Sequence, residues 1–254
     1  MTTAKAFTKG RPALVGYLPT GFPTVAGAKE AIAAMVASGV DIVEVGLPYS
    51  DPVIDGPVIQ RASEQALANG VRTRDVFDTV AAVAGQGVPI VVMTYWNPVE
   101  RYGVDAFARD LANAGGSGLI TPDLIPDEAG EWLAASDEHD LDRIFLVSPS
   151  STDDRIAMTT SHCRGFVYAT AVMGVTGARE STSTAAPTLV SRVKGVTNLP
   201  VGVGLGVRNG AQVREIAAYA DAVIVGSALV SALAESGTAG VAALTQELRS
   251  GLPA

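Results

Sequence analysis

The chain has 254 residues, of which 48% are hydrophobic and 17% are charged, and its formal net charge is −8. This length suits a single α/β barrel domain, and the hydrophobic fraction allows a large core. The acidic balance, without any cluster of Lys and Arg, argues against a nucleic-acid-binding protein.

The sequence gives no sign of secretion or of a membrane segment. Residues Met1–Gly10 lack the apolar stretch of a signal peptide. No apolar run reaches the length of a membrane span. The single cysteine, Cys163, cannot form an internal disulfide, which agrees with a reducing compartment. We therefore expect a cytoplasmic protein without a membrane partner.

Short β-branched runs alternate along the chain with Ala-rich stretches of helical periodicity. The runs predict eight strands, at Ala13–Leu18, Asp41–Val45, Pro89–Thr94, Gly118–Ile120, Arg143–Val147, Gly165–Ala169, Pro200–Val203 and Ala222–Val225. The stretches between them predict helices, among them Val25–Ala37, Gln60–Ala68, Val76–Ala84, Ala106–Ala114, Asp127–Ala135, Asp153–Ser161, Ala211–Tyr219 and Ser227–Ala234.

Eight strands that are each followed by a helix predict a (β/α)8 TIM barrel, as one domain over residues 1–254. Helix pairs between Asp51 and Gly85 indicate one extra helix after the second strand. An open doubly wound sheet is the alternative fold. It usually carries a G-x-G-x-x-G turn after its first strand, and Gly16–Pro23 does not match that pattern.

The segment after the second predicted strand carries the clearest chemical signal. It reads Glu44-Val-Gly-Leu-Pro-Tyr-Ser-Asp-Pro-Val-Ile-Asp-Gly-Pro57, an acidic loop stiffened by proline. Glu44 ends an apolar strand, where burial would raise its pKa and suit a group that both donates and accepts a proton. The alternative is a Glu paired with Lys or Arg, although no predicted strand end offers that partner. Asp55 is either a second acid–base group or the N-cap of a helix near Val58.

Glycines follow the last three predicted strands. The segments are Gly174-Val-Thr-Gly177, Val203-Gly-Leu-Gly206 and Val225-Gly-Ser227, the last of which opens a helix. Backbone N–H groups at a helix N-terminus bind anions, and barrels often hold phosphate at these loops. Turn formation alone also explains each glycine. Three such loops on one rim, however, predict a phosphate site.

Residues for other chemistries are missing or misplaced. His139 and His162 fall at predicted helix ends, and Cys163 lies just before a strand on the side opposite the rim, so we expect structural roles. No predicted strand ends in Lys, which disfavours Schiff-base chemistry. No His, Cys and Asp cluster has metal-ligand spacing, so no metal is expected. Carboxylate acid–base chemistry on a phosphorylated small molecule remains.

These motifs resemble the tryptophan synthase alpha chain family almost end to end. The matching segments are Gly16–Pro23, Glu44–Pro57, Met93–Pro98, Leu119–Leu124, Leu146–Ser151, Gly174–Arg179, Val203–Gly206 and Val225–Ser227. The resemblance implies a lyase of L-tryptophan biosynthesis that cleaves indole-3-glycerol phosphate to indole and glyceraldehyde 3-phosphate by a retro-aldol reaction. It implies catalysis by Glu44 and Asp55. It implies substrate and phosphate contacts from Tyr17, Tyr168, Thr176, Gly177, Gly206, Gly226 and Ser227.

The resemblance also implies a partner. The family works as an α2β2 heterotetramer and passes indole through a tunnel to a β chain that carries pyridoxal phosphate, so no cofactor is expected in this chain. The segment Thr176–Ala186 is expected to close over the site as a lid. Leu205, Ala171 and Val53-Ile54 depart from the usual family residues, which affects the shape of the pocket rather than the reaction.

Three other functions stay open on the sequence alone. One is a stand-alone lyase that releases free indole, and another is an isomerase of the phosphate-binding barrel type. The third is a non-catalytic regulatory subunit that binds the phosphorylated ligand, which an intact pair of Glu44 and Asp55 argues against.

Overall fold

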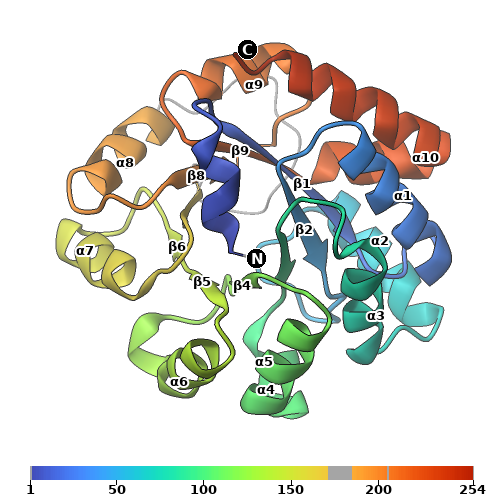
Figure 1. The fold of residues 1–254 in the computed structure, drawn as a ribbon, viewed down its shortest axis with the longest axis horizontal. Coiled ribbons are helices and arrows are strands. Elements are labelled where there is room, and N and C mark those ends of the chain that lie inside the picture. The colour runs from blue at the N-terminus through green and yellow to red at the C-terminus, as the bar shows by residue number, and fades with distance from the viewer. Residues whose placement is uncertain (1, 171–184, 205, 254) are drawn as a thin grey trace.

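The computed structural model describes residues 2–170, 185–204 and 206–253, and it shows a ring of strands surrounded by helices (Figure 1). The strands are β1 (Ala13–Pro19), β2 (Ile42–Gly46), β3 (Ile90–Met93), β4 (Gly118–Ile120), β5 (Asp142–Ile144), β6 (Leu146–Val147), β7 (Val167–Thr170), β8 (Val201–Gly204) and β9 (Ala222–Val225). The helices are η1 (Thr3–Thr8), α1 (Val25–Ala37), α2 (Pro57–Ala68), α3 (Arg74–Val83), α4 (Trp96–Tyr102), α5 (Val104–Asn113), η2 (Pro126–Glu128), α6 (Gly130–Glu138), α7 (Asp153–His162), α8 (Ala185–Lys194), α9 (Gly210–Ala217) and α10 (Ser227–Ser250).

The strands pair in parallel, in the order β5-β4-β3-β2-β1-β9-β8-β7-β6. The two strands at the ends of this order, β5 and β6, are consecutive in the chain and are separated only by Phe145. Together they fill one position of the ring, so the predicted strand Arg143–Val147 is split in two. The predicted (β/α)8 barrel is confirmed, whereas a single domain over residues 1–254 stays a prediction.

All eight helices named in the prediction are present, α1 with the predicted ends and the others with shifted ends. The extra helix after β2 is confirmed, since α2 and α3 both precede β3. Helix α2 begins at Pro57 rather than at Gln60, because proline is favoured in the first turn of a helix. Helix α10 continues far past the predicted end at Ala234, across a break at Gly237 whose φ is 60°.

Helix α10 is also long and apolar enough to cross a membrane by length and composition, contrary to the expectation that no apolar run reaches that length. In the structure it packs against α1, α2, α9 and β1 in the outer ring. The break at Gly237 divides it into two shorter helical pieces. These contacts identify α10 as a helix of the barrel wall.

Two apolar layers follow from the alternation of side chains along the strands. Inward-facing residues such as Val15, Ile42 and Val91 fill the centre of the barrel. Their neighbours, such as Leu14 and Val43, face outward and pack under the helices. Because parallel strands end at one rim, the inward positions nearest that rim line the mouth of the barrel.

The N-terminal segment covers the other end of the barrel, as Figure 1 shows. Ala6 and Phe7 of η1 join the inner apolar layer, and the Phe7 ring lies 5.9 Å from that of Phe166. Thr3 donates both its backbone N–H and its hydroxyl to Asp142, at 2.7 Å each. This segment therefore closes the end opposite the mouth.

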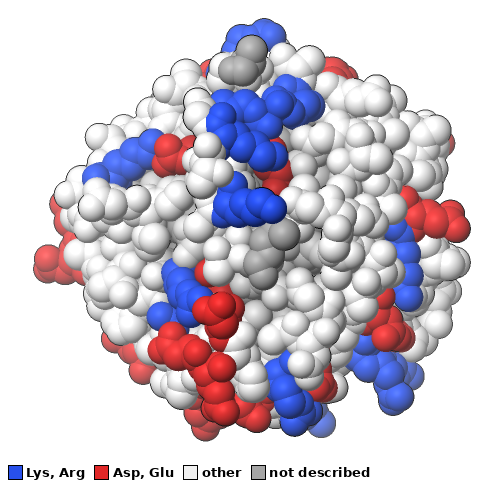
Figure 2. Space-filling model, in the orientation of Figure 1, with Lys and Arg blue, Asp and Glu red and all other residues white. Residues whose placement is uncertain are grey.

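Charged residues fix the same segment to the barrel. The carboxylate of Asp41 accepts hydrogen bonds from Lys9, from Arg11 and from the backbone N–H of Leu14. Figure 2 shows this face, where basic and acidic side chains lie next to one another. A groove of about 540 Å³ opens here beside Arg11 and Lys194. Both cations are already paired, Arg11 with Asp41 and Lys194 with Asp221.

Candidate active site

Glu44 points into the barrel at the level of the mouth. It follows the inward-facing Ile42 by two residues on β2, and it lies opposite Tyr17 in the register of β1 and β2. The residue is 2% exposed, and its Oε2 atom has no hydrogen-bond partner among the described residues. Burial, and then the charge of Asp55, raise the pKa of Glu44 to about 8. At neutral pH this side chain therefore carries a proton.

Asp55 reaches the same site from the loop between β2 and α2. The residue is 8% exposed, and burial raises its pKa to about 6, while a hydrogen bond from Tyr95 acts in the opposite direction. Asp55 is thus mostly ionised at neutral pH. The alternative role as an N-cap is not realised, because α2 begins at Pro57 and its N-cap residue is Gly56.

Tyr95 holds this loop in place and was not assigned a role from the sequence. Its hydroxyl accepts hydrogen bonds from the backbone N–H groups of Val53 and Ile54, each at 3.1 Å, and bonds to the carboxylate of Asp55. The amide of Gln60 adds a bond of 2.7 Å to the carbonyl oxygen of Asp55. The position of Tyr95 just after β3 was the available signal, but the sequence does not show which loop it contacts.

Two tyrosine hydroxyls lie beside the carboxylates. Burial raises the pKa of Tyr17 and of Tyr168 well above the ordinary value, and the charges of Glu44 and Asp55 add to that rise. Both phenols therefore stay neutral and can donate a hydrogen bond. The family resemblance implied one site for Tyr17, Tyr168, Glu44 and Asp55, and their electrostatic coupling is consistent with that expectation.

Glycine makes room for each of these rings. A Cβ atom at Gly46 would overlap the hydroxyl of Tyr17. A Cβ atom at Gly204 would lie only 2.5 Å from the hydroxyl of Tyr168. Gly46 lies within the Glu44–Pro57 segment, but its packing role was not predicted, because it depends on a contact between neighbouring strands.

Part of the predicted phosphate site is described. Gly226 is the N-cap residue of α10, and Ser227, which is 7% exposed, is the first residue of that helix. Gly206 follows β8 with φ of 68°, a conformation that favours glycine. These residues place backbone N–H groups at the mouth ends of the last two strands. Several predicted residues lie outside the described part of the chain. They are Ala171, Leu205 and residues 176–184 of the expected lid, which include Thr176 and Gly177.

The two histidines and the cysteine, for which structural roles are expected, lie away from the barrel mouth. His139 is the C-cap residue of α6, and His162 ends α7 with its Nδ1 atom 2.9 Å from the carbonyl oxygen of Met158. Cys163 packs against the outer apolar layer, and burial raises the pKa of its thiol to about 12. None of these three residues has been brought to the mouth.

Comparisons with known proteins agree with this geometry. A family model described as "Tryptophan synthase alpha chain" matches residues 3–250. The chain is 65% identical over 253 residues to the tryptophan synthase alpha chain of Salinispora arenicola, covering 98% of this chain and 95% of that one. It is also 65% identical over 243 residues to the alpha chain of Mycobacterium intracellulare, covering 96% and 90%.

The chain belongs to the tryptophan synthase alpha chain family. A solved structure of Mycobacterium tuberculosis tryptophan synthase superimposes with a TM-score of 0.94 at 62% identity, covering 98% of this chain and 97% of the other. This family cleaves indole-3-glycerol phosphate, so the prediction of a carbon–carbon lyase of tryptophan biosynthesis is confirmed. Its members form part of a tryptophan synthase assembly.

Proposed function

We propose that Glu44 and Asp55 perform the cleavage of indole-3-glycerol phosphate, with Glu44 as the acid and base and Asp55 as the electrostatic partner of the indole ring. One observation carries this proposal. Two buried carboxylates lie close enough to influence each other at the mouth, yet their pKa values, about 8 and about 6, fall on opposite sides of neutral pH. One site thus offers a protonated acid beside a carboxylate anion.

In the first step, the carboxyl group of Glu44 gives its proton to carbon C3 of the indole ring. The ring becomes a cation whose charge is centred on its N–H group. The carboxylate of Asp55 accepts a hydrogen bond from that N–H and stabilises the cation. The apolar walls around Glu44 keep its carboxyl group protonated until the substrate is bound.

In the second step, the carboxylate of Glu44 removes the proton from the side-chain hydroxyl next to C3. The hydroxyl oxygen becomes the aldehyde oxygen of glyceraldehyde 3-phosphate as the bond to C3 breaks. The electron pair of that bond returns to the ring, which restores neutral indole. Glu44 ends the cycle protonated, as it began, so no other acid or base is required.

The phosphate group of the substrate binds to backbone N–H groups at Gly206, Gly226 and Ser227, and to Thr176 and Gly177, which follow β7 in the sequence. The segment Gly226–Val230 contains no Lys or Arg, so the N-terminal dipole of α10 supplies the positive potential there. The rings of Tyr17 and Tyr168 line the space for the substrate between the N-terminus of α10 and the two carboxylates.

A β chain that carries pyridoxal phosphate is the proposed partner, in a cytoplasmic α2β2 heterotetramer that takes up the indole. The described surface supports a partner at the mouth. Val53, in the loop that holds Asp55, is 70% exposed, and Ile125, after β4, is 42% exposed. A partner that contacts this loop would favour its ordered form and so raise the cleavage rate.

The test is production of indole from indole-3-glycerol phosphate by the wild-type chain, with and without a β chain. Glu44→Gln should keep the fold and lower turnover by about a hundredfold or more, and Asp55→Asn should lower turnover more than it weakens binding of a glycerol phosphate analogue. Asp51→Ala, on the exposed part of the same loop, serves as the matched control. It should leave the isolated chain active.

Two results would change this assignment. Turnover of Glu44→Gln within about tenfold of wild type would remove Glu44 from the chemistry. Full activity of the isolated chain, with no response to an added β chain, would favour the stand-alone lyase.

A further inference from the structure

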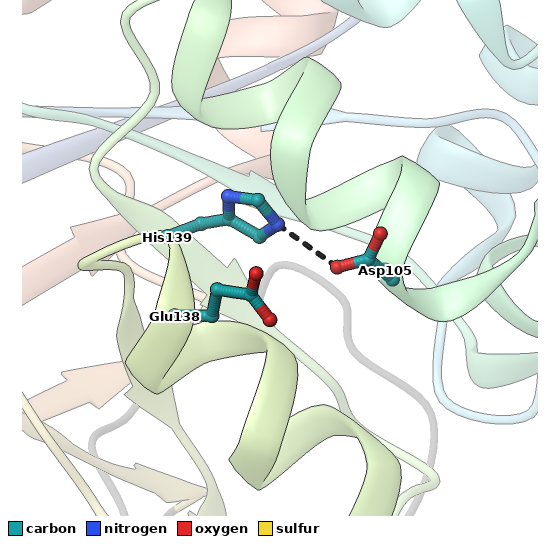
Figure 3. Close-up of side chains that lie close together, drawn as sticks. All are labelled: Asp105, Glu138 and His139. Carbon is teal, nitrogen blue, oxygen red and sulfur yellow. Dashed lines mark hydrogen bonds and ion pairs between the residues drawn. The ribbon is translucent and has the colours of Figure 1, made fainter.

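Three side chains that can bind a metal ion meet between two helices of the outer ring. Helices α5 and α6 lie side by side there (Figure 1). Asp105 comes from the first turn of α5, while Glu138 ends α6 and His139 caps it. Figure 3 shows the three side chains turned toward one another. The sequence alone predicts no such cluster, because Asp105 and His139 are 34 positions apart.

The imidazole of His139 is the fixed member of this cluster. Its side chain is only 19% exposed, and its Nε2 atom lies 2.9 Å from Oδ1 of Asp105, whose side chain is 64% exposed. One ligand atom from each of the three residues lies within 4.8 Å of the other two. A partly buried imidazole thus faces two exposed carboxylates whose side chains can change rotamer.

The charges around the imidazole are not balanced. Within the part of the chain that the structure describes, neither Asp105 nor Glu138 forms an ion pair with Lys or Arg. Glu138 also lies at the C-terminus of α6, where the helix dipole already presents negative charge. A divalent cation at this point would offset both carboxylates and the end of the helix.

The donor set indicates which cation. One imidazole nitrogen with two carboxylate oxygens suits Zn²⁺ and similar transition-metal ions, whereas Mg²⁺ and Ca²⁺ prefer oxygen ligands alone. Tetrahedral coordination at about 2.0–2.2 Å sets ligand atoms roughly 3.3–3.5 Å apart. The Nε2 and Oδ1 atoms would need to separate by about half an ångström, which rotation of the exposed Asp105 side chain allows.

We propose that Asp105, Glu138 and His139 form a binding site for a transition-metal ion of the Zn²⁺ type, which links α5 to α6 outside the active site. The ion takes the place of the hydrogen bond between His139 and Asp105, and water completes its coordination. The site is independent of the residues at the barrel mouth. Its occupancy should therefore change stability rather than catalysis.

The experiment uses the full chain after removal of metal by a chelator. Zn²⁺ is titrated in competition with a chromophoric chelator, and thermal unfolding is followed with and without Zn²⁺. We expect one bound equivalent and a rise in melting temperature with Zn²⁺ concentration. Mg²⁺ at the same concentration should give no rise, and equal stabilisation by Mg²⁺ would overturn the proposal.

Matched variants locate the site. His139→Ala should weaken Zn²⁺ binding at least tenfold and abolish the Zn²⁺-dependent rise in melting temperature, and Asp105→Asn and Glu138→Gln should each weaken binding severalfold. The controls are His162→Ala, which removes the other histidine of the chain, and Glu131→Gln, which removes a carboxylate from the same helix. Both should bind Zn²⁺ like wild type.

The proposal fails if His139→Ala binds Zn²⁺ as tightly as wild type, or if His162→Ala loses as much affinity as His139→Ala. If the loss of His139, the C-cap residue of α6, disturbs folding, the Asp105→Asn variant is used instead to test the site. Unchanged Zn²⁺ binding in a folded Asp105→Asn variant would likewise exclude this cluster as the site.

Discussion

At the residue scale, burial is the main cause of the raised pKa values of both Glu44 and Asp55. The difference between them comes from what surrounds each carboxylate. The Oε2 atom of Glu44 has no hydrogen-bond partner within the described part of the chain, whereas Asp55 receives a hydrogen bond from Tyr95 that favours its ionised form. One neutral and one ionised carboxyl group can therefore coexist in the same site at neutral pH.

This difference predicts a bell-shaped pH profile of kcat/KM. Activity should fall as pH drops through about 6, because Asp55 becomes protonated, and as pH rises through about 8, because Glu44 loses its proton. Steady-state cleavage rates from pH 5 to 9.5 measure both limbs, whose apparent pKa values belong to the coupled pair. A rate that keeps increasing beyond pH 9 would be incompatible with Glu44 as the initial acid.

The same pKa shift predicts an effect on stability. The pKa of Glu44 is raised in the folded state, so its favourable contribution is complete below the ordinary value of 4.5 and is lost as pH rises toward about 8. Glu44→Gln does not titrate, so its melting temperature relative to wild type should increase from pH 5 through about pH 8 and then level off. Each pKa unit corresponds to about 1.4 kcal/mol. Parallel pH curves for the two proteins would contradict the burial argument.

At the element scale, the loop between β2 and α2 is held in place by one side chain, that of Tyr95, which lies just after the end of β3. Tyr95→Phe removes the hydroxyl that binds the N–H groups of Val53 and Ile54 and the carboxylate of Asp55. Turnover should fall by at least about tenfold, because the loss of a single positioning hydrogen bond of roughly 1.4 kcal/mol has that effect and the hydroxyl makes three such bonds. The acid limb of the pH profile should also move to higher pH, because Asp55 loses a bond that lowers its pKa.

The control for this change is Tyr49→Phe, since the Tyr49 ring lies 5.2 Å from that of Tyr95 and loses the same atom. It should leave the acid limb in place. If Tyr95→Phe reduced the rate without any movement of the acid limb, Tyr95 would act on the loop alone and not on Asp55.

Elements with local causes could be predicted from the sequence, and those with distant causes could not. Runs such as Ala222–Val225 are strands because β-branched residues are buried on both faces, and the prediction matches β9. The break at Phe145 leaves no local signal, because it reflects closure of the ring. Helix α4 was missed since it is short and carries Pro98 near its start.

The residues of the candidate site also fall into those that the sequence could reveal and those that it could not. Glu44 and Asp55 stood out because carboxylates are unusual in and beside a buried strand. The roles of Tyr95, Gly46 and Gly204 arise from contacts with other elements, so no spacing rule could reveal them.

At the scale of the whole molecule, the ion pairs of Asp41 connect the N-terminal segment to the barrel. Burial by itself raises the pKa of Asp41, but the hydrogen bonds from Arg11, Lys9 and the Leu14 amide outweigh it and lower the pKa. The contribution of Asp41 is therefore complete above its ordinary value of 3.8 and is lost as pH falls through the lowered pKa.

Asp41→Asn should destabilise the protein by about 3 kcal/mol at pH 7, because the largely buried Arg11 loses its anion. Thermal and urea unfolding measure this loss of stability. At temperatures where Asp41→Asn remains folded, it should keep its activity. Asp140→Asn is the control, since Asp140 pairs with Arg164 while its side chain is 80% exposed. That change should cost no more than about 1 kcal/mol. Equal losses would mean that burial of the pair does not matter.

Closure of one end of the barrel by η1 has a consequence for molecular traffic. Side chains fill the centre of the barrel, and Phe7 and Phe166 cover the end opposite the mouth, so no small molecule can pass along the barrel axis. With the proposed site at Glu44 and Asp55, phosphorylated substrate would enter and both products would leave at the mouth, next to the loop between β2 and α2. A protein seated on those loops would stand across the whole flow of small molecules. Control of indole release would then require no change in the cleavage chemistry, only control of access to the mouth.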